Sequence, residues 1–357
     1  MVGGSLGKAL LTRKLAGEVV GVDPAPGVLE KAVALGAVCH GAASLAEGVA
    51  GADVIILATP VSTTLTLLSD LGSLVGEEKV LVSDVCSTKA RVVSHAASVL
   101  PQTASFIGGH PMAGSEKEGV EALDGDLFEN ALYILTAASG SDPFALEAME
   151  KLVKGLGAVP VVMEATQHDR VVAAISHLPH MAASALAQTA AGCTEYRNEL
   201  LALAAGGFRD TTRVAMGNPV MWKDICLSNS DHIIAMMDQF SKELATLRTL
   251  IAEGEEKALL NYFDQAREFR RQVPFRGKGI LPPIYNLYIY IPDRPGIIGE
   301  VATRLGASGV NIAEIELLRV REEEGGPLRL GFLSIHGRRD AAAMLNKEGF
   351  RTEMQED

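Results

Sequence analysis

The residues best suited to chemistry in this sequence surround His110. The stretch from Ile107 to Gly119 ends an apolar run with two glycines and places His110 directly before Pro111, which cannot donate to a strand ladder. We therefore expect the imidazole at the carboxyl end of a strand, where open α/β sheets hold their ligands. Histidine can take a proton near neutral pH. The alternative is a histidine whose hydrogen bonds are simply satisfied within a turn.

Alternating strands and helices precede and follow this stretch. Continuous apolar strands at 53–58, 79–84, 131–136 and 158–163 are separated by amphipathic helices. This pattern is typical of a mostly parallel sheet covered on both faces. It predicts an α/β fold class, with a doubly wound, Rossmann-type dinucleotide-binding domain over residues 1–164.

The first residues have the order that a dinucleotide site requires: glycines, a helix, a strand and then the acid Asp23. Gly3 corresponds to the third glycine of the fingerprint, while the first strand and the first two glycines have no counterpart. We expect a start assigned too late or a trimmed chain; the alternative is a chain that lacks this strand and binds pyrophosphate poorly. A carboxylate repels a 2′-phosphate, so Asp23 favours NAD as cofactor. The predicted cofactor-binding residues are Gly3, Gly4, Ser5, Asp23, Thr59 and Pro60.

Two further parts follow the sheet domain. Residues 165–275 contain helical patterns, with one helix expected over 229–271, and their broad apolar faces predict an all-helical substrate and dimerisation domain in a homodimer. A Gly/Pro linker spans 276–284. The βαββαβ pattern of 285–357, with a strand at 328–336 and a helix at 340–347, predicts a ferredoxin-like domain.

Composition limits the classes of partner. A net charge of -12 and a pI near 5.2 argue against nucleic acid and membrane surfaces as partners. The four cysteines are widely spaced, which predicts reduced thiols, no disulfide and no zinc. The apolar runs are far shorter than the roughly 20 residues of a membrane helix. We therefore expect a soluble, cytoplasmic protein, and an acidic net charge still permits an anionic small substrate, because a few local cations decide such binding.

Four motifs in order carry a resemblance to a known family: 84–89 (DVCSTK), 108–116 (GGHPMAGSE), 176–180 (SHLPH) and 206–213 (GGFRDTTR). Together they resemble the prephenate dehydrogenase family in its form with a C-terminal ACT domain. The resemblance implies NAD-dependent oxidative decarboxylation of prephenate to 4-hydroxyphenylpyruvate, a step of tyrosine biosynthesis. Arogenate dehydrogenase is the alternative enzyme, and a non-catalytic amino-acid sensor is the alternative from another class.

The resemblance also implies roles for individual residues. His110 is the base for the substrate hydroxyl, and Ser87 bonds the same hydroxyl or orients the histidine; a helix cap is the alternative for Ser87. Arg213 can grip a carboxylate bidentately, or instead form an ion pair between helices. His180 is similar to the family's carboxylate-binding histidine. The other predicted substrate-binding residues are Ser115, Glu116, His168 and Gly206.

Several assignments remain open at this point. Glu116 bonds or gates the substrate entrance, or is a solvated loop acid. His177 and His180 have a spacing that suits a metal, but no third ligand at a matching spacing appears, and no metal is predicted. ACT domains typically bind amino acids between paired copies, so L-tyrosine is the expected effector, with the regulatory residues Asp293, Pro295, Gly296 and Asn311; Asn311 is alternatively a plain turn residue.

Overall fold

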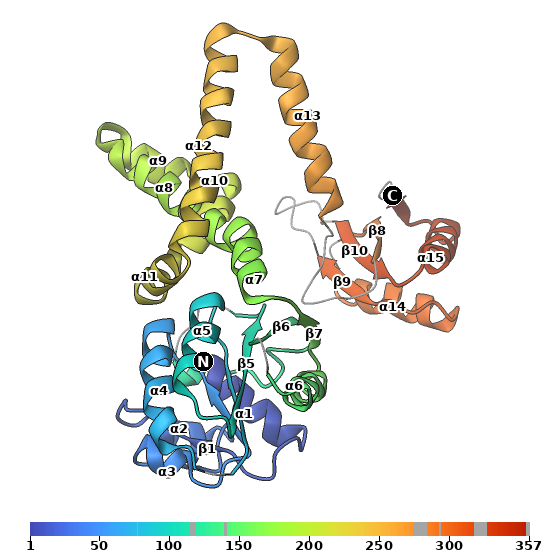
Figure 1. Cartoon of the computed structure of the whole chain (residues 1–357). Helices are drawn as coiled ribbons and strands as arrows, with labels where there is room; N and C mark the ends of the chain where they lie inside the picture. Colours follow the sequence, from blue (N-terminus) through green and yellow to red (C-terminus); the bar gives the residue numbers. More distant parts are fainter. Residues whose placement is uncertain are drawn as a thin grey trace. The chain divides into compact units, whose positions relative to one another are not determined.

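The computed structural model describes residues 1–76, 78–114, 119–138, 141–273, 284–292, 294–317 and 327–354. The chain divides into two compact units, Met1–Gly279 and Ile280–Asp357. Figure 1 labels the α-helices and several of the strands of both units. Within the described ranges, no helix has both the length and the apolar content needed to cross a membrane.

The first unit is built on a five-stranded sheet with the order β3-β4-β5-β6-β7. All neighbouring strands are parallel except β5 and β6, which are antiparallel. The mostly parallel sheet expected from the sequence is therefore confirmed. Its strands are β3 (Val54–Leu57), β4 (Val80–Asp84), β5 (Ala104–Pro111), β6 (Leu132–Ala137) and β7 (Val159–Val162).

Helices cover both faces of this sheet (Figure 1). Strand side chains alternate between faces, so that Phe106 and Ile107 enter different cores. The core that contains Phe106 is completed by α4 (Val61–Leu74) and α5 (Ala90–Val99). The core that contains Ile107 is completed by α1 (Val2–Thr12) and α6 (Pro143–Gly155). The continuous apolar strands of the sequence follow from this double coverage.

A separate parallel pair of short strands follows α1. It consists of β1 (Val20–Gly21) and β2 (His40–Gly41), which are not hydrogen-bonded to the five-stranded sheet. A Cβ added to Gly7 would lie 2.2 Å from the carbonyl oxygen of Ala37, so α1 approaches this segment through a position that only glycine fits. The short elements here and beyond β5 are α2 (Val28–Ala34), α3 (Leu45–Val49) and η1 (Val120–Ala122).

From Ala165 to Gln272 the first unit is helical, as expected. α7 (Ala165–Val172), a π-helical turn η2 (Ala173–His177) and α8 (Leu178–Gly192) follow one another without a break. The single helix predicted over 229–271 is wrong, because Gly254, in the left-handed region with φ 67°, ends α12 (Ser230–Glu253) before α13 (Glu256–Gln272). The other elements are η3 (Thr194–Tyr196), α9 (Arg197–Leu203), α10 (Gly206–Thr212), η4 (Arg213–Met216) and α11 (Pro219–Ser228).

The second unit has the element order β-α-β-β-α-β, which is typical of ferredoxin-like units. Its antiparallel sheet has the order β11-β8-β10-β9. The helix predicted at 340–347 begins earlier, because the Ser334 hydroxyl accepts a hydrogen bond from the Gly337 N–H and caps it, and the strand predicted at 328–336 is correspondingly shorter. The elements are β8 (Tyr285–Tyr290), α14 (Ile297–Ala307), β9 (Glu314–Leu317), β10 (Pro327–Phe332), α15 (Ile335–Lys347) and β11 (Arg351–Met354).

Candidate active site

A fully buried ion pair joins the carboxyl ends of β4 and β5. Lys89 Nζ binds Asp84 Oδ2 and also donates to the carbonyl oxygen of Gly109 at 2.7 Å. The Gly109 N–H donates to the other oxygen of Asp84 at 3.1 Å. A Cβ on Gly109 would lie 2.5 Å from the carbonyl oxygen of Asp84, so glycine permits this close approach. The ion pair therefore fixes both the N–H and the carbonyl oxygen of Gly109, the residue directly before His110.

His110 is the first member of a chain of three side chains. Its Nδ1 lies 2.8 Å from Nε2 of His168, and Nδ1 of His168 lies 2.8 Å from Oδ1 of Asp169. His168 and Asp169 are almost completely buried on α7, whereas His110 is partly exposed at the end of β5. The histidine singled out by the sequence therefore has a partner from the helical region.

A second cluster of aromatic rings lies beyond Asp169. Asn229 Nδ2 donates to the backbone carbonyl oxygen of Asp169 at 2.8 Å and lies 3.2 Å from Nδ1 of His177. His180, one turn further along the chain, stacks on Trp222 with ring centroids 3.5 Å apart. The Trp222 ring also meets the His177 ring edge to face. The two histidines of the 176–180 motif thus pack against one indole.

Burial keeps the rings of His110, His177 and His180 neutral. It lowers the pKa of His110 well below 6.5, with further lowering from His168, Lys89 and His177. Burial also lowers the pKa of His177 to about 4 and lowers that of His180. At neutral pH each of these rings has one nitrogen without a hydrogen, so His110 is in the form that accepts a proton.

Ser87 and Cys86 lie in the turn between β4 and α5. Ser87 is partly buried there, one residue before Thr88, whose hydroxyl is 2.9 Å from that of Ser228. Burial raises the pKa of the Cys86 thiol to about 12, and its sulfur lies 3.3 Å from the Thr64 hydroxyl. Cys86 therefore stays a thiol, in line with its having no assigned role.

The remaining predicted substrate residues lie further along the helical region. Gly206 begins α10 and Arg213 begins η4, and both are exposed. Both elements pack against α8, the helix that contains His180. Ser115 and Glu116 lie outside the described residues.

The predicted cofactor residues lie near the first turn of α1 and the strands beside it. A Cβ on Gly3 would be 2.8 Å from Cβ of Ala58, so this turn rests against the carboxyl end of β3, where Thr59 and Pro60 follow. Gly4 continues the turn, and Asp23 is exposed just after β1. A helix N-terminus beside glycines and a nearby acid fits a dinucleotide.

Ser5 differs from the rest of this set. Its side chain is fully buried, and its hydroxyl accepts a hydrogen bond from the Asp124 N–H at 2.9 Å. Its hydroxyl is thus engaged within the protein, and a contact with the cofactor would have to come from its backbone.

Sequence reasoning named Asp169 only as a pocket-lining neighbour of His168, and it assigned no role to Lys89 or Trp222, although all three organise the site. Asp169 directly follows His168, and Lys89 ends the 84–89 motif, but neither sequence position indicates that the side chain is buried. Trp222 is the only tryptophan of the chain, and a residue type used once could have been considered as a candidate for the site.

The stack on Trp222 predicts a pH-dependent fluorescence signal. Because burial lowers the pKa of His180, its ring is neutral at pH 7 and becomes a charged quencher of the indole only in acid. We expect the emission of Trp222 to fall with a midpoint below pH 6.5. A His180→Gln variant should keep only the transition of His177, near pH 4, and a control His40→Gln variant should match the wild type. A midpoint at or above 6.5 would contradict the assignment.

Comparisons with known proteins agree with this architecture. The family model for the prephenate dehydrogenase nucleotide-binding domain matches residues 6–162, and that for the prephenate dehydrogenase dimerization domain matches residues 164–265. A prephenate dehydrogenase of Bacillus subtilis is 39% identical over 345 residues, which are 96% of this chain and 92% of the relative.

Solved structures of prephenate and arogenate dehydrogenases are also similar to this chain. The structure of prephenate dehydrogenase from Aquifex aeolicus in complex with hydroxyphenyl propionate and NAD+ is 33% identical with a TM-score of 0.72, covering 76% of this chain and 94% of that one. Synechocystis arogenate dehydrogenase is 31% identical with a TM-score of 0.66, covering 76% and 96%. On the two family models and these relatives, the chain belongs to the prephenate dehydrogenase family of NAD-dependent oxidoreductases.

Proposed function

We propose that the protein oxidatively decarboxylates prephenate to 4-hydroxyphenylpyruvate. The observation that carries this proposal is the neutral His110 at the carboxyl edge of the sheet, backed by His168 and flanked by the turn that contains Ser87. Membership in an enzyme family argues against the alternative of a non-catalytic amino-acid sensor.

The reaction requires a base at the ring hydroxyl of prephenate. As the hydride leaves the carbinol carbon, the O–H bond breaks and the proton passes to a nitrogen of His110. NAD, when bound, supplies the hydride acceptor. Loss of the ring carboxylate as carbon dioxide then makes the ring aromatic. We assign Ser87, on the turn after the neighbouring strand, to bonding the same hydroxyl or to orienting the histidine.

The substrate also carries two carboxylates, which need donors. Arg213 supplies a permanent cation and a planar fork suited to a carboxylate. His180 is neutral, so it can donate one N–H without adding charge, and its ring is held in place by Trp222. Keeping His180 neutral limits the number of positive charges near His110, which must accept a proton.

Activity with prephenate and NAD tests the proposal. We expect NADH formation by the purified chain, and a loss of about 10²–10⁴-fold in kcat for His110→Asn, the range of general base catalysis. His95→Asn is the matched control, because His95 bonds Ser69 and Leu65 on the outer helices. Arogenate is offered in parallel, and turnover of arogenate alone would replace prephenate as the substrate.

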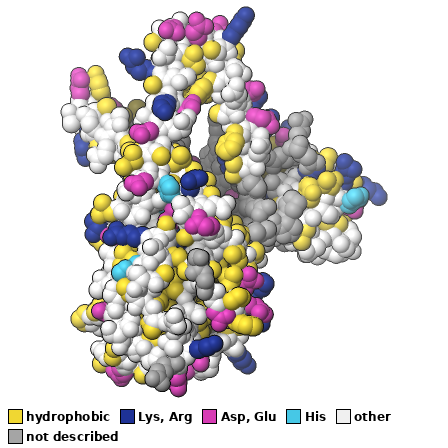
Figure 2. Space-filling model, viewed as in Figure 1, with side chains coloured by type: hydrophobic (Ala, Val, Ile, Leu, Met, Phe, Trp, Pro, Cys, Tyr) yellow, Lys and Arg dark blue, Asp and Glu magenta, His cyan; other side chains and the backbone are white. Residues whose placement is uncertain are grey.

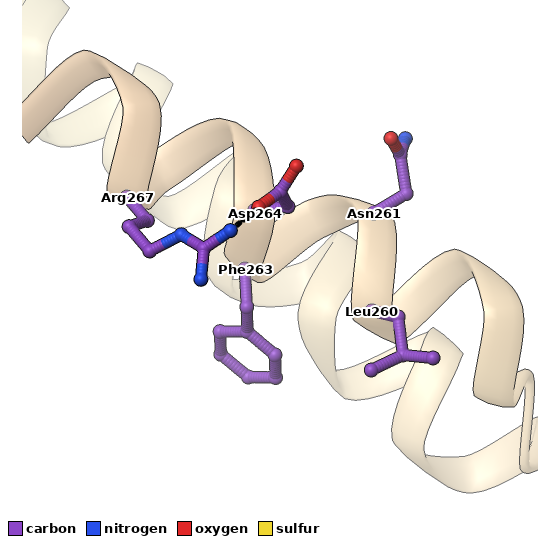
Figure 3. A pocket seen from close by; sticks show the side chains of 5 residues that line it. All are labelled: Leu260, Asn261, Phe263, Asp264 and Arg267. Atoms are coloured by element: carbon purple, nitrogen blue, oxygen red, sulfur yellow. Dashed lines mark hydrogen bonds and ion pairs between the residues drawn. The ribbon is translucent and has the colours of Figure 1, made fainter.

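We also propose that the working form is a homodimer. Large apolar side chains of the helical region are exposed in the single chain, and Figure 2 shows hydrophobic side chains at the surface of this part. On α13, Leu260 and Phe263 project on one side of the helix beside Arg267 (Figure 3). Burying these side chains against a second copy would remove them from water, and the matched family model is described as a dimerization domain.

Light scattering tests the assembly. We expect a mass of about twice the 37.7 kDa of one chain, and a shift toward one chain mass when Phe263, 57% exposed, is changed to Glu. Glu253→Gln on α12 is the surface control. A wild-type mass of a single chain at micromolar concentration would contradict the proposal.

We further propose that the second unit is an ACT domain that binds L-tyrosine. Gly296, in the left-handed region with φ 87°, precedes α14 directly and follows Pro295, while Asn311 lies in the loop after the same helix. Asp293 lies outside the described residues. An 11-residue helix is about 16 Å long, so one amino acid cannot touch both loops of one copy. Paired copies would supply one loop each.

Feedback by tyrosine has a direct measurement. Millimolar L-tyrosine should lower the rate of NADH formation and raise the melting temperature, since a ligand that binds only the folded state stabilises it. Gly296→Val should abolish both effects, because a β-branched residue does not tolerate the left-handed conformation. L-alanine is the control ligand. If tyrosine changes neither quantity, the regulatory proposal fails.

A further inference from the structure

We propose that His168 and Asp169 are positioning residues that hold His110 in one tautomer, with its hydrogen on Nδ1 and its Nε2 free to take the substrate proton. The sequence predicted a direct contact of His168 with the substrate. The role proposed here is different: His168 acts through His110. The identity of the substrate in this inference rests on the proposed function.

The chain of hydrogen bonds begins at an anchored carboxylate. Asp169 Oδ1 accepts from the backbone N–H of Lys89 at 2.7 Å, and Oδ2 accepts from the N–H of Ala90 at 2.9 Å. Both donors belong to the N-terminus of α5, where unpaired N–H groups and the helix dipole favour negative charge. Asn229 holds the backbone carbonyl of Asp169 as well. The carboxylate of Asp169 is therefore fixed and acts only as an acceptor.

The anchored carboxylate decides where each hydrogen lies. Because Asp169 Oδ1 accepts, Nδ1 of His168 carries a hydrogen. In the proposed arrangement His168 carries only this one hydrogen, so its Nε2 is an acceptor. The 2.8 Å contact with His110 then requires a hydrogen on Nδ1 of His110, and Nε2 of His110 keeps its lone pair.

The surroundings of His168 argue against a direct contact between its side chain and the substrate. Its side chain is fully buried, and both of its ring nitrogens already have partners within the protein. A substrate atom could reach neither nitrogen without breaking a bond in this chain. Lys89, His168 and His177 are the charged or titratable groups that act on His110, and together with burial they favour its neutral form.

The arrangement also serves the step after proton transfer. When Nε2 of His110 takes the hydroxyl proton, the ring becomes an imidazolium and still donates from Nδ1 to His168. The negative charge of Asp169 lies at the far end of the same chain. In serine proteases, an amide in place of the aspartate that orients the histidine leaves the wrong tautomer and lowers kcat about 10⁴-fold.

Steady-state kinetics on two His168 variants test the inference. His168→Leu removes the acceptor, and we expect kcat to fall by about 10²-fold with a nearly unchanged KM for prephenate. His168→Gln places an amide oxygen near the position of Nε2, where it can accept from Nδ1 of His110, and should recover most of this loss. His95→Leu, which removes an imidazole bonded to Ser69 outside the site, is the control and should leave kcat unchanged.

A double variant shows whether His168 acts through His110 or only supports the structure in general. If His168 acts only by setting the tautomer of His110, then His168→Leu in the background of His110→Asn costs no further activity. A structural defect would lower both backgrounds alike. Melting temperatures of all variants, measured with NAD, show whether the Leu side chain is tolerated; if it is not, the Gln variant and its double variant with His110→Asn carry the test.

Each contrary outcome has a definite meaning. A rise in KM with unchanged kcat in His168→Leu would show that His168 binds the substrate directly, and equal losses in both backgrounds would also overturn the inference. If the wild type turns over neither prephenate nor arogenate, the proposed function fails instead. The tautomer of His110 in the resting protein, read by nitrogen-15 resonance, would then decide the inference without activity.

Discussion

The buried pair of Asp84 and Lys89 is the interaction on which the site depends. Both side chains are fully buried, and between them they bind both backbone polar groups of Gly109. Removing one partner of such a pair leaves an uncompensated charge, which costs about 3–5 kcal/mol. The exposed pair of Lys151 and Glu147 on α6 has no comparable role, because water screens it. Of these two ion pairs, the one whose loss would cost more is thus also the one that fixes the end of β5, where His110 lies.

The turns at this edge of the sheet also bind the helical region. The first N–H groups of α5 bind Asp169 of α7, Thr88 meets Ser228 of α11, and Ser62 at the start of α4 donates to Asp224. These polar contacts lie at the carboxyl edge of the sheet, beside Ala165 of α7, which packs in the core that contains Phe106. One edge of the sheet therefore holds His110, His168 and the turn that contains Ser87, at the point where the sheet and the helical region of the first unit meet.

Much of the sheet was predictable because its central strands are buried on both faces. The run 131–136, which contains most of β6, is apolar without alternation. The start of α6 at Pro143, after the capping residue Asp142, is also visible in the sequence. The break at Gly254 was missed because the apolar pattern continues on both sides of it. The early start of α15 depends on a single serine cap. Local sequence patterns therefore predicted the presence of helices and strands more reliably than the residues at which they begin and end.

The site was predictable only in part. The motifs indicated His110, Ser87, His180 and Arg213. The sequence did not show that His168, 58 positions further along the chain, is buried and bonds His110. A sequence does not state which carboxylate meets a helix N-terminus, or that an imidazole has both nitrogens engaged. Those facts arise from the packing of α7 against α5, and they support the proposal that His168 acts through His110.

The measurement that tests the central claim most directly is the nitrogen-15 spectrum of the histidine rings in the resting protein at neutral pH. The resonances of His110 are identified by their loss in His110→Asn. Our account predicts a hydrogen on Nδ1 and none on Nε2, although free neutral histidine favours the opposite tautomer. A hydrogen on Nε2 of His110 would contradict it, because the nitrogen proposed to receive the substrate proton would already be occupied.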